Sequence, residues 1–252
     1  AEQRDDTLLA AVLRLDLASV LLDQGLPEPA YRQAETALQA CEDLGADEER
    51  ARALNLLGIV FRQQRDYRRA RDYYQQARQV FAQCGNRVGE ANTLHNFALL
   101  AQDRNYLRKA EESYSAALAI RREVGDRRGI AETLCNLGAI AQVKGESGLA
   151  DQYYRECLAI FRDFHNIADM ALALHNLGEV ATEEEKPERA LPLLATAQHI
   201  FSRIGSPYAS FSDQYISKLQ GHPALQPFDE RLRAAQRLGW DEIIGMALGP
   251  TE

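Results

Sequence analysis

The sequence contains few of the residues from which covalent or metal-based sites are built. Its 252 residues include four cysteines, Cys41, Cys84, Cys135 and Cys157, which lie far apart and form no CxxC pair. This spacing implies neither a disulfide framework nor a zinc site. We therefore expect a reducing, cytoplasmic environment, no metal and no cofactor.

Long apolar runs are also missing. The longest one is far shorter than a membrane span, and the first residues, AEQRDDTLLA, lack the basic flank and apolar core of a secretory signal. We therefore expect no membrane partner. The formal net charge of -8 argues against direct binding of nucleic acid, because affinity for the phosphate backbone depends on lysine and arginine. With 46% hydrophobic residues, the chain is nevertheless long enough to bury a large interior.

What the sequence does contain is a repeat with a period of 40 residues. Glycine or alanine recurs at this interval at Ala18, Gly58, Ala98, Gly138 and Gly178. A second series consists of Ala30, Ala70, Ala110, Ala150 and Ala190. A fixed period of this length is typical of a solenoid, in which each unit buries its apolar face against its neighbours. Function is then expected on a surface, and we expect no enzyme.

Each unit has the pattern of two helices joined by a short turn. In the third unit the apolar spacing predicts helices over residues 88–103 and 107–122. We expect the recurring small residues to allow close crossing between helices of adjacent repeats. The glycine that ends most units, as at Gly125, suits a helix C-cap with positive φ. At the fourth linker His165 replaces glycine, and we expect Asn166 to serve in its place.

The register matches a known family. The residues Leu54, Leu57-Gly58, Phe61, Ala70, Tyr74 and Ala77 resemble the tetratricopeptide repeat, and the segment GDRRGIAETLCNLGAIA resembles its 40-residue variety, which occurs in kinesin light chains, spindle-orientation adaptors and bacterial regulators. The resemblance implies an all-α fold, a right-handed α-α superhelix with five repeats within residues 1–205. The expected repeats are about 6–45, 46–85, 86–125, 126–165 and 166–205. Residues 206–252 are expected to form degenerate capping helices.

A second resemblance covers the C-terminal part. The segments ALPLLATAQHIFSRIGSP and FDERLRAAQRLGWDEIIGMALG are similar to the C-terminal end of bacterial LuxR- and AfsR-type (STAND NTPase) transcription regulators. That resemblance implies a sensor or interaction region of a larger signal-transduction protein. No GxxxxGK[ST] nucleotide-binding motif is present in this sequence.

The resemblance also implies where a ligand would bind. In a tetratricopeptide superhelix the first helix of each repeat lines a concave groove. The residue two positions before the recurring glycine or alanine faces this groove. Here that position holds Asp16, Leu56, Asn96, Asn136 and Asn176. An asparagine amide both donates and accepts, so it can pair with the backbone of an extended peptide. Alternatively, these asparagines hydrogen-bond between adjacent helices and fix the stacking, and the two roles are compatible.

Neighbouring positions complete the predicted groove. Besides the three asparagines, the candidate contacts are Asn55, His95, His175, Arg52, Arg62, Leu99, Gln102, Gln142 and Glu179. Among the charged candidates, Arg52 and Arg62 stand against six acidic residues: Asp16, Asp23, Asp103, Glu132, Glu179 and Glu183. We therefore expect a groove that is acidic overall and basic only near the second repeat. It would favour a protein or peptide segment with apolar and basic residues, or another domain of the parent protein. The alternative is a structural array that mediates self-association or autoinhibition without a ligand of its own.

Overall fold

The computed structural model describes residues 2–248, apart from the side chains of residues 2, 3 and 241. Residues 1 and 249–252, the latter part of the predicted cap, lie outside the described residues. Over the described range the chain folds into α-helices and one short 3-10 helix, with no strand. The predicted all-α fold is therefore confirmed. None of these helices is long and apolar enough to cross a membrane.

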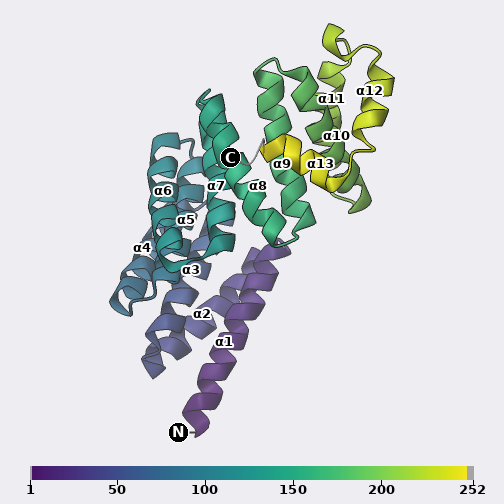
Figure 1. Cartoon of the computed structure of the whole chain (residues 1–252). Coiled ribbons are helices and arrows are strands. Elements are labelled where there is room, and N and C mark those ends of the chain that lie inside the picture. Colours follow the sequence, from purple (N-terminus) through teal and green to yellow (C-terminus); the bar gives the residue numbers. More distant parts are fainter. Residues whose placement is uncertain (1, 249–252) are drawn as a thin grey trace. The chain divides into compact units, whose positions relative to one another are not determined.

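The chain divides into two compact units, Ala1–Asp126 and Arg127–Glu252. Figure 1 labels their helices. Unit 1 contains three helix pairs: α1 (Glu2–Asp23) with α2 (Pro27–Leu44), α3 (Asp47–Gln63) with α4 (Tyr67–Gln83), and α5 (Arg87–Asp103) with α6 (Leu107–Val124). Unit 2 contains two further pairs: α7 (Arg127–Val143) with α8 (Ser147–Asp163), and α9 (Ile167–Glu183) with α10 (Pro187–Arg203). It ends with α11 (Tyr208–Leu219), η1 (Pro223–Leu225), α12 (Phe228–Ala235) and α13 (Trp240–Leu248).

The recurring glycines face a large side chain on the second helix of their own repeat. A Cβ atom added at Gly58 would lie 2.4 Å from the ring of Tyr74, and one at Gly138 would lie 2.6 Å from the ring of Tyr154. Both tyrosines are fully buried. The expectation that these small residues allow close crossing between helices of adjacent repeats was therefore wrong at Gly58 and Gly138, since the close contact there is within one repeat. The missing Cβ atom of each glycine leaves room for the tyrosine ring against the first helix.

Successive repeats are joined by a separate apolar contact. In unit 1, Ala30 and Ala34 of α2 lie in one buried cluster with Leu57 and Val60 of α3. A similar cluster joins α4 to α5 of the next repeat through Ala70, Tyr74 and Leu100. Small residues on the second helix thus meet larger ones on the first helix of the next repeat, which allows close packing of the two helices.

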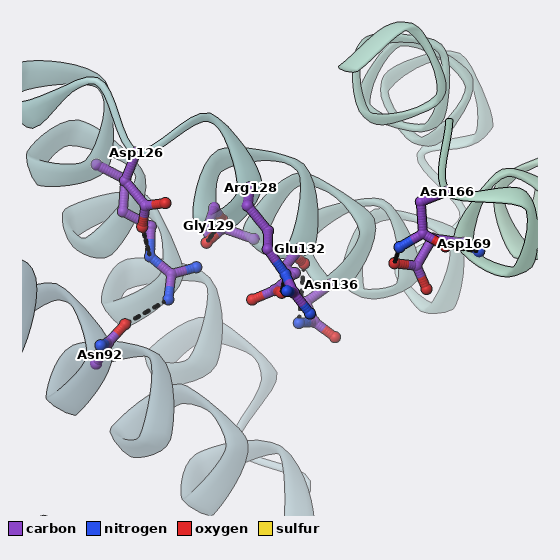
Figure 2. Close-up of polar contacts among 10 residues, drawn as sticks. Asn92, Asp126, Arg128, Gly129, Glu132, Asn136, Asn166 and Asp169 are labelled. Atoms are coloured by element: carbon purple, nitrogen blue, oxygen red, sulfur yellow. Dashed lines mark hydrogen bonds and ion pairs between the residues drawn. The ribbon is translucent and has the colours of Figure 1, made fainter. Parts of the chain in front are cut away.

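The turns between repeats follow the predicted chemistry with one exception. Gly125 has a φ of +73° and Gly205 a φ of +67°, as expected for helix C-caps. At the fourth linker the residue with positive φ is His165 itself, at +53°. Asn166 instead caps α9, where its Oδ1 accepts a hydrogen bond from the backbone N–H of Asp169 at 3.3 Å (Figure 2). The expected role of Asn166 was wrong, because its side chain satisfies the start of the next helix.

Candidate functional site

In unit 1 the predicted contacts form pairs between the first helices of neighbouring repeats. The amide of Asn96 on α5 donates to Oδ1 of Asn55 on α3 at 2.9 Å. The guanidinium of Arg62 on α3 lies 3.1 Å from the carboxylate of Asp103 on α5. Each pair joins residues 41 positions apart. At Asn96 the geometry therefore favours the stacking role over a free amide.

The expected basic area near the second repeat does not form. Besides the Arg62 pair, the guanidinium of Arg52 lies 2.9 Å from the carboxylate of Asp16 on α1. Both predicted basic residues of this region are thus neutralised by acids from neighbouring first helices. Because the Arg52 pair is exposed to water, its contribution to stability is small, below about 1 kcal/mol.

His95 is held in the packing between α5 and α6. Its ring meets the edge of Tyr114 with centroids 5.1 Å apart, and its Nδ1 is enclosed without a hydrogen-bond partner among the described residues. Burial lowers the pKa of His95 to about 3, and the positive charges of Arg121 and Arg62 act in the same direction. His95 is therefore a neutral, half-buried residue that packs against Tyr114, and its predicted contact with a ligand stays a prediction.

Gln102 and Leu99 complete the predicted set of unit 1. The side-chain oxygen of Gln102 accepts a hydrogen bond from the hydroxyl of the buried Tyr114 at 3.1 Å. Leu99 is half-buried. Gln102 thus anchors the core tyrosine.

In unit 2 three predicted residues meet at a pocket of about 340 Å³. We call it the acidic pocket, and it is lined by Ala139, Gln142, Val143, Tyr154, Asn176, Glu179 and Glu183. Gln142 and Val143 come from α7, whereas Asn176 and the two glutamates come from α9. The glutamates lie four residues apart and so project from the same side of the helix.

The Gln142 side chain is fixed from both ends. Its Nε2 donates to Glu183 at 2.8 Å and lies 3.5 Å from an oxygen of Glu179. Its oxygen accepts from the hydroxyl of Tyr154 at 3.2 Å. Burial raises the pKa of Tyr154, and the nearby carboxylates of Glu179 and Glu183 add to this. Two carboxylates are therefore held side by side by a rigid amide, with no lysine or arginine among the residues that line the pocket.

His175 lies behind this pocket and does not face it. The residue is 4% exposed, which corrects its predicted place in the groove. Its Nε2 lies 3.0 Å from the Glu179 carboxylate, and its Nδ1 lies 2.9 Å from the hydroxyl of Ser212 on α11. Since a carboxylate only accepts, Nε2 donates to Glu179, and in the neutral ring Nδ1 accepts from Ser212. His175 thus orients Glu179 and connects the pocket to the C-terminal helices.

The three predicted asparagines occupy different environments. Asn96 is paired with Asn55. The amide of Asn136 donates to the backbone carbonyl of Glu132 in its own helix at 3.0 Å (Figure 2). Asn176 is half-buried at the acidic pocket, and its side chain makes no hydrogen bond to another residue within 2–248. Only Asn176 retains a free amide.

Glu183 and Tyr154 belong to the acidic pocket although neither was among the predicted contacts. The sequence placed Glu183 among the charged positions of the groove but not among the candidate contacts. Its spacing of four residues from Glu179 was the signal that could have made it a candidate contact. Tyr154 follows the packing register of Tyr74 and Tyr114, which gave no sign that its hydroxyl would bond Gln142 at the pocket.

The sequence and the fold were compared with known proteins. A protein-family model for the tetratricopeptide repeat matches residues 8–83 and 85–163. A sequence comparison with curated proteins found no match.

Similar solved structures include aspartyl phosphate phosphatase F from Bacillus subtilis, at 15% identity and a TM-score of 0.73, covering 92% of this chain and 60% of that one. A Rap protein in complex with competence and sporulation factor matches at 18% identity and a TM-score of 0.66, and the match covers 95% of this chain and 65% of that one. A STAND protein with a tetratricopeptide repeat sensor from Pyrococcus horikoshii matches at 16% identity and a TM-score of 0.73, and the match covers 93% of this chain and 40% of that one.

This chain spans less than two thirds of each of these three proteins. At such identities the likeness concerns the fold. The family follows from the sequence match, which covers more than half of the chain, and from the helix pairs that repeat every 40 residues. The chain belongs to the tetratricopeptide-repeat family.

Proposed function

We propose that this chain is a non-catalytic interaction module and that its acidic pocket binds a protein or peptide segment with basic and apolar residues. Tetratricopeptide repeats are typically protein-interaction modules. The observation that carries the proposal is the pair Glu179 and Glu183, held beside the free amide of Asn176 without a lysine or arginine in the pocket lining. Such a site attracts a cationic side chain and disfavours an anionic one.

The acidic pocket offers three kinds of contact. The carboxylates can accept charge-assisted hydrogen bonds from a lysine or arginine, which are roughly twice as strong as neutral ones. Val143, which is 69% exposed, offers an apolar contact at the rim. Asn176 can pair with the N–H and C=O of an extended backbone. A basic residue beside an apolar one therefore fits the pocket.

We further propose that the chain is the sensor or regulatory region of a larger bacterial signal-transduction or transcription regulator in the cytoplasm. Its fold resembles a STAND protein with a tetratricopeptide repeat sensor and a Rap protein bound to a competence and sporulation factor. The resemblance of its C-terminal segments to LuxR- and AfsR-type regulators supports the same context. The partner is then a separate peptide or protein, or another domain of the parent protein, and not nucleic acid.

Fluorescence anisotropy with a panel of labelled peptides tests the pocket. We expect peptides with adjacent basic and apolar residues to bind, and their acidic counterparts not to bind. Glu183→Gln should weaken binding about tenfold, since it removes one charge-assisted hydrogen bond. Asn176→Ala should also weaken binding without changing the melting temperature.

Glu230→Gln is the matched control, because it neutralises an exposed glutamate on α12 of the same unit. It should leave affinity unchanged. Equal affinity of the wild type and Glu183→Gln for every bound peptide would contradict the acidic pocket as the binding site.

A second candidate function, self-association, rests on an exposed apolar stripe on α1. Leu13, Leu17 and Val20 are 59%, 47% and 51% exposed. Forty residues later the same positions hold Ala53, Leu57 and Val60, all at most 1% exposed. Contiguous exposed apolar surface of this kind marks interaction sites. Sedimentation velocity tests it: concentration-dependent dimers that disappear in Leu13→Gln/Leu17→Gln support self-association, and a monomer at every concentration rules it out.

A further inference from the structure

Unit 2 contains a second, larger pocket that has no residue in common with the acidic pocket. Its volume is about 450 Å³, and it lies among the start of α9, the C-terminal half of α10 and the segment between α12 and α13. Ile167, Ile204 and Trp240 form apolar walls and are 50%, 52% and 39% exposed. His199 and Arg203 line the same space. We call it the Trp240 pocket.

The repeat register explains why this pocket exists. In two earlier repeats the first residue of the first helix is an arginine that pairs with an acid 36 residues later. These pairs are Arg87–Glu123, at 2.8 Å, and Arg127–Asp163, at 2.6 Å. The corresponding residues of the next repeat are Ile167 and Arg203. An apolar side chain has therefore replaced the arginine, and an arginine has replaced the acid.

This exchange leaves a cation beside exposed apolar surface. The side chain of Arg203 forms no ion pair or hydrogen bond to another residue within 2–248, in contrast to the two earlier pairs. The neighbouring carboxylate of Glu242 accepts a hydrogen bond from the backbone N–H of Gly239 at 3.0 Å. The Trp240 pocket thus combines a guanidinium without a carboxylate partner, an imidazole and three large apolar side chains.

We propose that the Trp240 pocket binds a small monocarboxylic acid that carries one bulky apolar group. Arg203 presents a planar fork of donors that matches a carboxylate, and His199 offers a further donor. The apolar group would lie against Ile167, Ile204 and Trp240, so that its burial removes apolar surface of both partners from water. The volume is that of a small-molecule site, and a single guanidinium suits a single negative charge.

The chain offers a direct optical probe, because Trp240 is its one tryptophan. The full chain is titrated with N-acetyl-L-phenylalanine while tryptophan emission is recorded. We expect a saturable change in emission. N-acetyl-L-phenylalanine amide, which lacks the carboxylate, should bind at least about tenfold more weakly, as expected for the loss of a charge-assisted hydrogen bond.

Two variants test the residues of the pocket. Arg203→Gln should weaken binding of N-acetyl-L-phenylalanine about tenfold or more. Ile167→Glu should abolish this binding, because the new carboxylate would form an ion pair with the guanidinium of Arg203, as in the two earlier repeats. Arg233→Gln, at an exposed arginine of α12, is the control and should bind as the wild type does.

Circular dichroism melting of each variant establishes that it is folded at the titration temperature. If Arg203→Gln is unfolded there, Ile167→Glu decides the outcome. The absence of a saturable emission change at millimolar probe overturns the proposal. Equal affinity of the acid and its amide, or of a folded pocket variant and the wild type, overturns it as well. The outcome is independent of the acidic pocket, because the two share no residue.

Discussion

At the scale of single residues, the same residue type has different roles at equivalent positions. Asn96, Asn136 and Asn176 share one register, yet one pairs with a neighbouring repeat, one bonds its own helix and one keeps a free amide. What differs is the neighbour. Asn55 on α3 accepts from Asn96, whereas Asn176 lies beside Glu179 and Gln142 in the acidic pocket.

The glycines give a sharp prediction at this scale. Gly138→Ala would bring a Cβ atom to 2.6 Å from the ring of the buried Tyr154. We expect it to lower the free energy of unfolding by about 1–3 kcal/mol, because the packed ring has to move. Gly148→Ala on α8 meets nothing within 4 Å and is the matched control. It should stabilise the protein by up to about 1 kcal/mol, since alanine is the better helix former. Urea unfolding measures both, and equal effects of the two would contradict the packing argument.

His95 predicts a dependence of stability on pH. Its pKa is about 3 in the folded chain against an ordinary 6.5, so the unfolded chain takes up this proton first as the pH falls. The contribution of His95 to stability is therefore full above pH 6.5 and is lost between 6.5 and 3, by up to about 1.4 kcal/mol per pH unit. In His95→Gln the free energy of unfolding should fall less steeply over this range.

Urea unfolding of the wild type and His95→Gln at a series of pH values measures that difference. His199→Gln, which changes an exposed imidazole, is the control for the loss of a histidine elsewhere. A slope in His95→Gln as steep as that of the wild type would show that His95 does not remain neutral.

At the scale of helices, the environment of a repeat position depends on whether another helix covers it. Leu57 on α3 is buried together with Ala30 and Ala34 of α2. Leu17 holds the same register position on α1 and is 47% exposed. The periodic pattern of α1 is thus that of a buried helix, whereas its surroundings are those of a surface helix.

This contrast gives a matched pair of substitutions. Leu57→Ala should lower the free energy of unfolding by about 2–5 kcal/mol, because it leaves a cavity between α2 and α3. Leu17→Ala should change it by less than about 1 kcal/mol, because water already reaches the side chain. Chemical denaturation of both variants is the measurement, and a comparable loss in Leu17→Ala would mean that α1 is covered in solution.

At the scale of the whole molecule, the net charge of -8 and the proposed acidic pocket act in the same direction on a basic ligand. The proposed binding of a basic peptide should weaken about tenfold between roughly 0.05 M and 0.5 M NaCl, since salt screens the attraction. Glu183→Gln should reduce this salt dependence. Anisotropy titrations across the salt series measure it, and an affinity independent of salt would point to apolar contacts as the dominant force.

The fold was predictable from the sequence because its signals are local and repeated. The recurring small residues and the 40-residue period locate the helices and turns, and family membership follows from the same pattern. The candidate site was predictable only in part. Gln142, Asn176 and Glu179 meet at one pocket, whereas His175 is buried, His95 packs against Tyr114, and Arg52 and Arg62 are paired with acids.

The sequence by itself therefore determined the helical repeat and its period, since these depend on spacing along one chain. The tertiary structure alone decided which polar side chains remain free. The hydrogen bond between Asn96 and Asn55 joins residues 41 positions apart. Arg203 and Ile167, which replace an acid and an arginine of the earlier repeats, lie 36 positions apart. The packing of the helices fixes the distances between such residues. These distances decide which amides and charged groups pair within the protein and which remain available to a partner.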